Sequence, residues 1–151
     1  MKRLGFILLW PGLFLYFVAS KRTRVMLVHK DEILLVQDSS RYFFDDKSWT
    51  LPGGGIQRGE EVQIAATREL REELGLEVEP DSLVTKAKQR SGSHGLTYQA
   101  YFLLYEAATK PVLGELSKEI KAARWFTLDE AAQLQLKREA RQGLQLLAEQ
   151  R

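Results

Sequence analysis

The 151-residue sequence has no cysteine, only four prolines and only two histidines. Without cysteine the chain forms no disulfide, offers no thiol nucleophile and binds no metal through thiolates, which fits a reducing compartment. No internal repeat, low-complexity tract or second domain interrupts the sequence. With 44% apolar residues over this length, the chain has enough material for the core of one domain.

The net charge of +2 is unevenly distributed along the chain. Residues 1–24 hold five basic residues and no acidic one, which leaves 17 of the 22 basic residues against all 20 acidic ones in the remainder. The basic character therefore belongs to the N-terminal segment. No run of basic and aromatic residues follows it, so we expect no nucleic-acid-binding groove.

A glycine-rich stretch at residues 53–55 precedes a segment with three glutamates on a predicted helix. At 3.6 residues per turn, Glu69 and Glu73 lie one turn apart and Glu72 lies on their flank, so we expect the three carboxylates to converge. Like charges packed this closely raise one another's pKa unless a cation compensates them. A cluster of oxygen ligands favours Mg²⁺ or Mn²⁺.

The segment from Gly54 to Leu76 has constrained spacing: Gly, five residues, Glu, seven residues, then Arg-Glu-apolar-x-Glu-Glu-x-Gly-apolar. It resembles the signature of the Nudix hydrolases at every constrained position. The flanking residues 49–53 and 124–130 also look like those of the family, and the resemblance covers roughly residues 22 to 149. Gln57 departs from the pattern, because many relatives carry an acid there.

The resemblance implies the Nudix fold, an α/β/α sandwich around a mixed β-sheet of the α+β or α/β class, over residues 22–151. The pattern predicts a hairpin of residues 24–29 and 32–37, a helix from about Glu60 to Leu74 and strands at residues 84–90, 96–105 and 123–126. A short strand at residues 49–51 precedes the glycines, and residues 91–95 connect two strands. A capping box at residues 127–130 is expected to open one long C-terminal helix with Leu134, Leu144 and Leu147 in the core.

The resemblance also implies the roles of individual residues. Glu69, Glu72 and Glu73 would hold Mg²⁺ or Mn²⁺ with the backbone carbonyl of Gly53, and Arg68 would pair with Glu60 in a structural role. For the catalytic base we consider Glu119, which lies six residues before Trp125, with Glu115 as its neighbouring competitor, and also Glu69 or Glu72. The residues assigned to substrate binding are Arg41, Phe43, Gly54 and Gly55.

The implied activity is metal-dependent hydrolysis of the diphosphate linkage in a nucleoside diphosphate derivative, in the cytoplasm. The alternatives are a non-catalytic nucleotide-binding module and a membrane-associated protein that acts on a nucleoside-diphosphate sugar or alcohol. The residues that mark known subfamilies after the motif are absent, so the sequence does not identify one substrate. No proline lies between Pro80 and Pro111, which argues against the ADP-ribose type, and Tyr98 is misplaced for the dinucleoside-polyphosphate type.

The N-terminal arm, residues 1–21, contains an uncharged run of residues 4–19 between basic residues. This run is shorter than the roughly 20 residues that span a bilayer, and Pro11-Gly12 interrupts it. Three interpretations remain open: a packed or dimer-forming segment, an interfacial or re-entrant membrane anchor, and a spanning or secretory segment. The first two make homodimerisation or membrane association an expectation for this chain.

Overall fold

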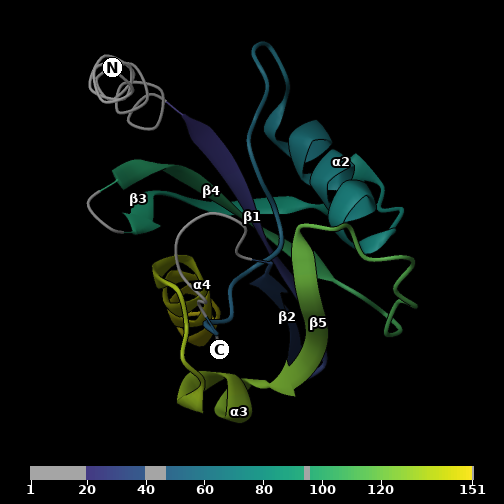
Figure 1. The fold of residues 1–151 in the computed structure, drawn as a ribbon, viewed down its shortest axis with the longest axis vertical. Helices are drawn as coiled ribbons and strands as arrows, with labels where there is room; N and C mark the ends of the chain where they lie inside the picture. The colour runs from purple at the N-terminus through teal and green to yellow at the C-terminus, as the bar shows by residue number, and fades with distance from the viewer. Residues whose placement is uncertain (1–19, 40–46, 94–95, 151) are drawn as a thin grey trace, which may run out of the picture.

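The computed structural model describes residues 20–39, 47–93 and 96–150 (Figure 1). In this part of the chain, five strands form one mixed sheet in the order β3-β4-β1-β2-β5. The pairing is parallel between β1 and β4 and antiparallel between the other neighbours. The strands are β1 (Lys21–His29), β2 (Glu32–Asp38), β3 (Val84–Ser93), β4 (Leu96–Glu106) and β5 (Ile120–Thr127).

The predicted hairpin is confirmed as β1 and β2, joined by a turn in which Lys30 adopts a φ of 56°. The register pairs Val28 with Ile33 and His29 with Glu32. Beyond these two pairs, β1 pairs along its length with β4, and β2 pairs with β5. The two strands of the hairpin therefore pair with each other only next to the turn, and most residues of each strand pair with another strand.

The segment of residues 49–56 bonds to both strands of this hairpin. It contributes isolated bridges where a short strand was expected at residues 49–51. Its main-chain hydrogen bonds to these two strands join four residue pairs: Thr50 with Val36, Val25 with Pro52, Thr23 with Gly54 and Ile56 with Lys21. The glycine-rich segment is therefore fixed by the backbones of β1 and β2.

Helices cover both faces of the sheet, as Figure 1 shows, with α2 (Val62–Leu74) on one face and α3 (Leu128–Gln133) and α4 (Arg138–Ala148) on the other. Each face has its own core. The core under α2 contains Val25, Leu27, Leu34, Ala66, Leu70 and Leu74. The core under α3 and α4 contains Met26, Ile33, Leu35, Leu51, Phe102 and Leu147. The predicted α/β/α sandwich is confirmed.

Helix α2 begins at Val62, two residues later than the sequence suggested. Glu60 instead forms a turn with Gln57, whose carbonyl accepts a hydrogen bond from the Glu60 amide and whose amide donates to the Glu60 carboxylate. The helix ends as predicted at Gly75, which adopts the left-handed φ of 63°. A Cβ at this position would lie 2.8 Å from the Cα of Gly114, so the close approach also requires glycine.

The C-terminal region corrects one expectation. The capping box is present, since Thr127 accepts a hydrogen bond from the Glu130 amide and the Glu130 carboxylate accepts one from the Thr127 amide. The expected single long helix, however, is two helices separated by residues 134–137. Trp49 explains the break, because its amide donates to the Gln135 carbonyl and its carbonyl accepts from the Lys137 amide. Backbone pairing with a distant segment therefore replaces helical hydrogen bonds.

The predicted core leucines lie where expected: Leu147 is buried, and Leu134 and Leu144 pack against the same core. Strand β3 continues to Ser93, so the connection to β4 is shorter than the predicted residues 91–95. A short 3-10 turn, η1 (Pro80–Ser82), precedes β3.

Strand β1 begins at Lys21, the last residue assigned to the N-terminal arm. The uncharged run of residues 4–19 lies outside the described residues. Within residues 20–39, 47–93 and 96–150, no helix is long and apolar enough to cross a membrane.

Candidate active site

A hollow of about 510 Å³ lies beside the glycine-rich segment, residues 53–55. It brings together side chains from α2, from the two central strands and from the loop before β5. The carboxylates that line it are Asp38, Glu69, Glu73 and Glu119, and the cations are Arg22 and Arg24. The hollow therefore collects the predicted loop glycines, two of the three predicted helix glutamates and the predicted loop acid.

Glu73 lies deepest among the α2 carboxylates, and its Oε2 accepts a 2.9 Å hydrogen bond from the amide of Gly53. Burial raises the pKa of Glu73 to about 8, and the neighbouring charges of Glu69 and Asp38 add to this. The Gly53 hydrogen bond and the charge of Arg24 act in the opposite direction. At neutral pH the metal-free side chain thus holds a proton that a bound cation would displace.

Glu69 is the second α2 carboxylate in the hollow, with its side chain 14% exposed. Burial raises its pKa, although Arg68 opposes this through a 2.8 Å hydrogen bond from Nη1 to Oε1. The carboxylate rests against the backbone of Gly54, where a Cβ would lie 2.5 Å from Oε2. The Glu69 carboxylate therefore occupies the space that a side chain at position 54 would fill, so this position requires glycine.

The guanidinium of Arg68 connects the loop to the helix. It forms a two-pronged ion pair with Glu60, from Nε to Oε1 at 2.8 Å and from Nη2 to Oε2 at 3.0 Å. Nη2 also donates to the carbonyl of Gly55 at 2.8 Å. The hydrogen bonds from Arg68 hold the pKa of Glu60 below its ordinary value. The pairing expected from the spacing is confirmed, and its geometry is that of a structural clamp.

Glu72 does not line the hollow of about 510 Å³ that Glu69 and Glu73 share. Its side chain is 58% exposed, and its Oε2 lies 3.3 Å from Nη1 of Arg68, one turn earlier on the helix. It lines a neighbouring hollow of about 370 Å³ with Glu69, Glu73 and residues 117–119. The three carboxylates therefore border one hollow but do not lie close enough together to bind one ion, because Glu72 extends toward solvent and is paired with Arg68.

The hollow nevertheless fits a divalent cation. Among the described residues, no three Asp, Glu or His side chains lie close enough together to hold a metal ion in this conformation. Glu69 and Glu73, however, supply hard oxygen donors that face one hollow, and the missing side chain of Gly54 leaves the space in which the Glu69 carboxylate lies. These two residues would hold Mg²⁺ or Mn²⁺, and Glu72 would join them after turning away from Arg68.

Three residues behind the hollow were missed by sequence reasoning: Arg24, Tyr98 and Glu139. Arg24 is buried and donates from Nη1 to the Gly53 carbonyl at 2.6 Å. Its Nη2 donates to Oη of Tyr98 at 3.1 Å and to Oε1 of Glu139 at 3.3 Å. Tyr98 also donates to Glu139. The signal available in the sequence was the pair Arg22 and Arg24, which share one face of β1 with Met26 and Val28.

This buried network shifts the pKa values of Glu139 and Tyr98 and occupies the backbone carbonyl of Gly53. Burial alone would raise the pKa of Glu139, but the charge of Arg24 and the hydrogen bond from Tyr98 hold it below its ordinary value. Burial raises the pKa of Tyr98, so the phenol remains a donor. The Gly53 carbonyl, predicted as a metal ligand, already accepts a hydrogen bond from a guanidinium.

The loop before β5 carries Glu119 to the hollow. Its backbone is attached to α2 through a 3.0 Å hydrogen bond from the Ser117 amide to the Glu73 carbonyl. It is attached to the end of β2 through a 2.7 Å bond from the Ser39 amide to the Glu119 carbonyl. Of the two loop acids considered from the sequence, Glu119 is the one that lines the hollow. Arg41 and Phe43 lie outside the described residues.

An α/β/α sandwich with a glycine-rich loop against an acidic helix defines a class of phosphate-handling hydrolases. Residues 20–147 match the family model described as the NUDIX domain, so the chain belongs to the Nudix family. Members of this family are hydrolases that act on nucleoside diphosphate derivatives.

Curated relatives agree with this assignment. The chain is 28% identical over 109 residues to "Nudix hydrolase 2" of Arabidopsis thaliana, covering 68% of this chain and 36% of the relative. It is 41% identical over 61 residues to the human "8-oxo-dGDP phosphatase NUDT18", covering 40% of this chain and 18% of the relative. The chain thus spans about a third or less of these relatives' length.

Solved structures share the fold. A MutT NUDIX hydrolase from Burkholderia pseudomallei superposes with a TM-score of 0.72 at 24% identity, over 85% of this chain and 98% of that one. A NUDIX hydrolase from Nitrosomonas europaea gives a TM-score of 0.73 at 21% identity, over 87% of this chain and 90% of that one.

Proposed function

We propose that this chain hydrolyses the diphosphate linkage of a nucleoside diphosphate derivative with the help of Mg²⁺ or Mn²⁺. The observation that carries the proposal is the pair of carboxylates, Glu69 and Glu73, that face one hollow directly behind the loop of residues 53–55. Burial raises the pKa of both carboxyl groups, and a bound cation would relieve the repulsion between them.

The chain itself positions the reactants. Glu69 and Glu73 would hold the cation, which would neutralise phosphate oxygens and acidify a water molecule. Arg22 and Arg24 line the same hollow and attract the diphosphate, while Arg68 holds the loop against the helix. The hydrolysis itself adds the water oxygen to phosphorus and breaks the bond from that phosphorus to the bridging oxygen, which leaves with the second phosphate.

We propose that Glu119 is the general base, which accepts the proton of the attacking water. Its carboxylate reaches the hollow from a different element than the metal-holding glutamates, and Glu119 is exposed. Glu69 and Glu72, the alternative bases, both accept a hydrogen bond from the guanidinium of Arg68, which occupies one oxygen of each. A general base contributes roughly 10² to 10⁴ in rate, so its loss is measurable.

The names of relatives suggest which substrates to test first. They include an "8-oxo-dGDP phosphatase" and, in Bacillus subtilis, a "Putative ADP-ribose pyrophosphatase YjhB", with which the chain is 27% identical over 140 residues. We propose a panel of nucleoside di- and triphosphates, nucleoside-diphosphate sugars and dinucleotides, each with Mg²⁺ or Mn²⁺ and with EDTA.

The proposal expects metal-dependent release of a nucleoside monophosphate or a phosphate product from at least one compound. Glu73→Gln and Glu69→Gln should each lower turnover at least about a hundredfold and weaken Mn²⁺ binding, whereas Glu119→Gln should lower kcat without changing Mn²⁺ affinity. Arg71→Ala is the control, since its side chain is 58% exposed and pairs with Glu77. Tight binding of one compound without any product would instead indicate a non-catalytic nucleotide-binding module.

A further inference from the structure

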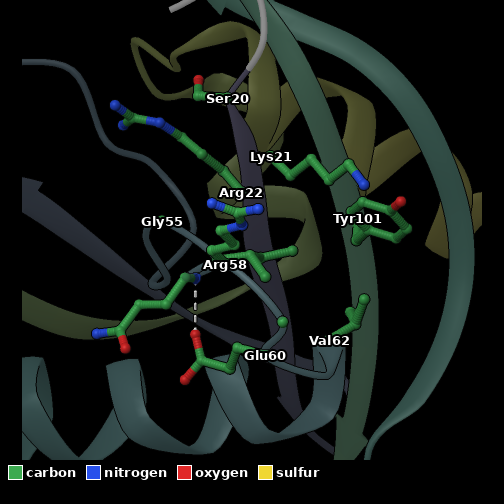
Figure 2. Close-up of a pocket in the computed structure, with 11 residues that line it drawn as sticks. Ser20, Lys21, Arg22, Gly55, Arg58, Glu60, Val62 and Tyr101 are labelled. Carbon is green, nitrogen blue, oxygen red and sulfur yellow. Dashed lines mark hydrogen bonds between the residues drawn. The ribbon is translucent and has the colours of Figure 1, made fainter. Parts of the chain in front are cut away.

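A second hollow, of about 620 Å³, lies on the other side of the glycine-rich segment (Figure 2). It is formed by the start of β1, the loop before α2, the first turn of α2 and the middle of β4. Arg22 and Gly55 line both this hollow and the acidic one, so the two share a rim. The side chains used in the argument are Lys21, Arg22, Arg58, Ile56, Val62 and Tyr101.

The second hollow has the opposite charge to the first. Its lining includes the cations Lys21, Arg22 and Arg58. The lining carboxylate, Glu60, already accepts two hydrogen bonds from the guanidinium of Arg68. Lys88 does not line the hollow, but its ammonium lies 5.4 Å from the centre of the Tyr101 ring. The acidic hollow next to it carries four carboxylates against two arginines. A basic and an acidic hollow thus meet at Gly55.

The inner wall of the second hollow is apolar. Val62 and Tyr101, which pack against the core under α2, contribute to it together with Ile56. Figure 2 shows the Lys21 side chain extending toward the ring of Tyr101, so charge and apolar surface lie next to each other. Such a hollow suits a group with an uncharged body and an anionic end.

Gly55 leaves the passage between the hollows open. A Cβ at this position would meet no atom within 4 Å, in contrast to Gly54, whose Cβ would collide with Glu69. A substrate whose diphosphate lies at Glu69 and Glu73 can therefore extend across Gly55 without crossing a side chain of the loop.

We propose that the second hollow binds the part of the substrate beyond the hydrolysed diphosphate, and that this part carries a further phosphate. This inference rests on the proposed function and narrows it to nucleoside diphosphate derivatives with a phosphate-bearing distal group. A nucleoside diphosphate linked to a phosphorylated sugar has this chemistry. Lys21 and Arg58 bind the distal phosphate, and Tyr101 and Val62 pack against the body of the group.

Binding without metal tests the hollow independently of turnover. Full-length protein in EDTA is titrated with inorganic tripolyphosphate by calorimetry, while NMR follows the Val62 methyl groups and the Tyr101 ring. We expect binding that shifts these signals, and a Kd about tenfold higher for Lys21→Gln/Arg58→Gln, which corresponds to about 1.4 kcal/mol. The matched control, Arg71→Gln/Lys86→Gln, removes the same charge from exposed residues and should bind like wild type.

Kinetics then separate the two kinds of substrate. For a substrate with a distal phosphate, Lys21→Gln/Arg58→Gln should raise KM about tenfold with kcat unchanged, and for one with a neutral distal group it should change neither. Equal losses in the control variant, equal losses for both substrates, or unshifted Val62 and Tyr101 signals would overturn the inference. If wild type hydrolyses no compound, the proposed function fails, and the tripolyphosphate titration still decides whether the hollow binds phosphate.

Discussion

The amide of Gly53 donates a 2.9 Å hydrogen bond to Oε2 of Glu73, and the two residues lie twenty positions apart in the sequence. The carbonyl of the same glycine accepts a 2.6 Å hydrogen bond from Arg24, which Glu139 of α4 holds from the far side. One loop residue is thus attached to both helix layers. The placement of Glu73 depends on the opposite face of the sheet as well as on its own helix.

The first prediction concerns protons released on metal binding. Because burial raises the pKa of Glu73 to about 8, this side chain is protonated in the metal-free protein at pH 7 and must lose its proton to a bound cation. Mn²⁺ binding should therefore release close to one proton at pH 7 and almost none above pH 9, and the affinity should rise with pH up to about 8. Calorimetry in buffers of different ionisation enthalpy measures this release.

The control for this prediction is Glu73→Gln, which has no proton to release. The same pKa also predicts a stability effect in EDTA. Between pH 4.5, the ordinary pKa of a glutamate, and about pH 8, the folded state keeps a proton that the unfolded state loses, so stability falls as pH rises through this window. Denaturant unfolding at pH 5 and pH 8.5 should show this fall in wild type and a smaller one in Glu73→Gln. Equal falls in the two proteins would contradict the assignment.

The second prediction compares two neighbouring glycines. Gly54→Ala places a Cβ 2.5 Å from the Glu69 carboxylate, whereas Gly55→Ala places one in open space. We expect Gly54→Ala to weaken Mn²⁺ binding and lower turnover at least about tenfold, because Glu69 must move, and Gly55→Ala to keep the metal affinity of wild type. Electron paramagnetic resonance of free Mn²⁺ measures both affinities. Similar affinities for the two variants would show that Glu69 does not need its present position.

Much of the fold was predictable because its signals are local. The hairpin of β1 and β2, the C-cap at Gly75 and the capping box at Thr127 each depend on residues a few positions apart. The helix break at residues 134–137 was not predictable, because it depends on backbone pairing with Trp49, which lies far away in the sequence. A local sequence pattern does not show that a distant backbone segment competes with the hydrogen bonds of the helix.

The site divides in the same way. The spacing of the motif placed Glu69 and Glu73 one turn apart and brought Arg68 within reach of Glu60, although Glu60 lies in the turn before α2. Glu72 lies on the flank of Glu69 and Glu73, as the periodicity predicted, but the periodicity does not show that its carboxylate pairs with Arg68. The contacts of Arg24 with Tyr98 and Glu139 join three distant segments and are visible only in the folded chain.

The third prediction concerns this buried network. Arg24→Met leaves the Glu139 carboxylate buried without its cation, and Glu139→Leu leaves the arginine without its carboxylate. Each single variant should lower the free energy of unfolding by about 3 kcal/mol, while the double variant should lose less than the sum, since no charge remains buried without its partner. Urea denaturation of all four proteins measures this coupling. Additive losses would show that the pair contributes little.

The fourth prediction concerns the arm of residues 1–21, whose apolar run lies outside the described residues. We propose that this uncharged run binds a second copy of the chain or a membrane surface. Light scattering and membrane fractionation should show either a dimer or a pelleted protein, which becomes a soluble monomer when residues 1–19 are removed. A full-length monomer in solution, with no change after truncation, would remove both interpretations.

The hydrogen bonds that join residues 49–56 to β1 and β2 attach the glycine-rich segment to the sheet, although this segment also borders the candidate active site. Stability and activity consequently depend on the same backbone bonds. An engineer who lengthened this segment to admit a new substrate would open the sheet at the same time. Changes of substrate range are better sought in the loop before β5 and at the start of β1, which border the two hollows without separating the central strands.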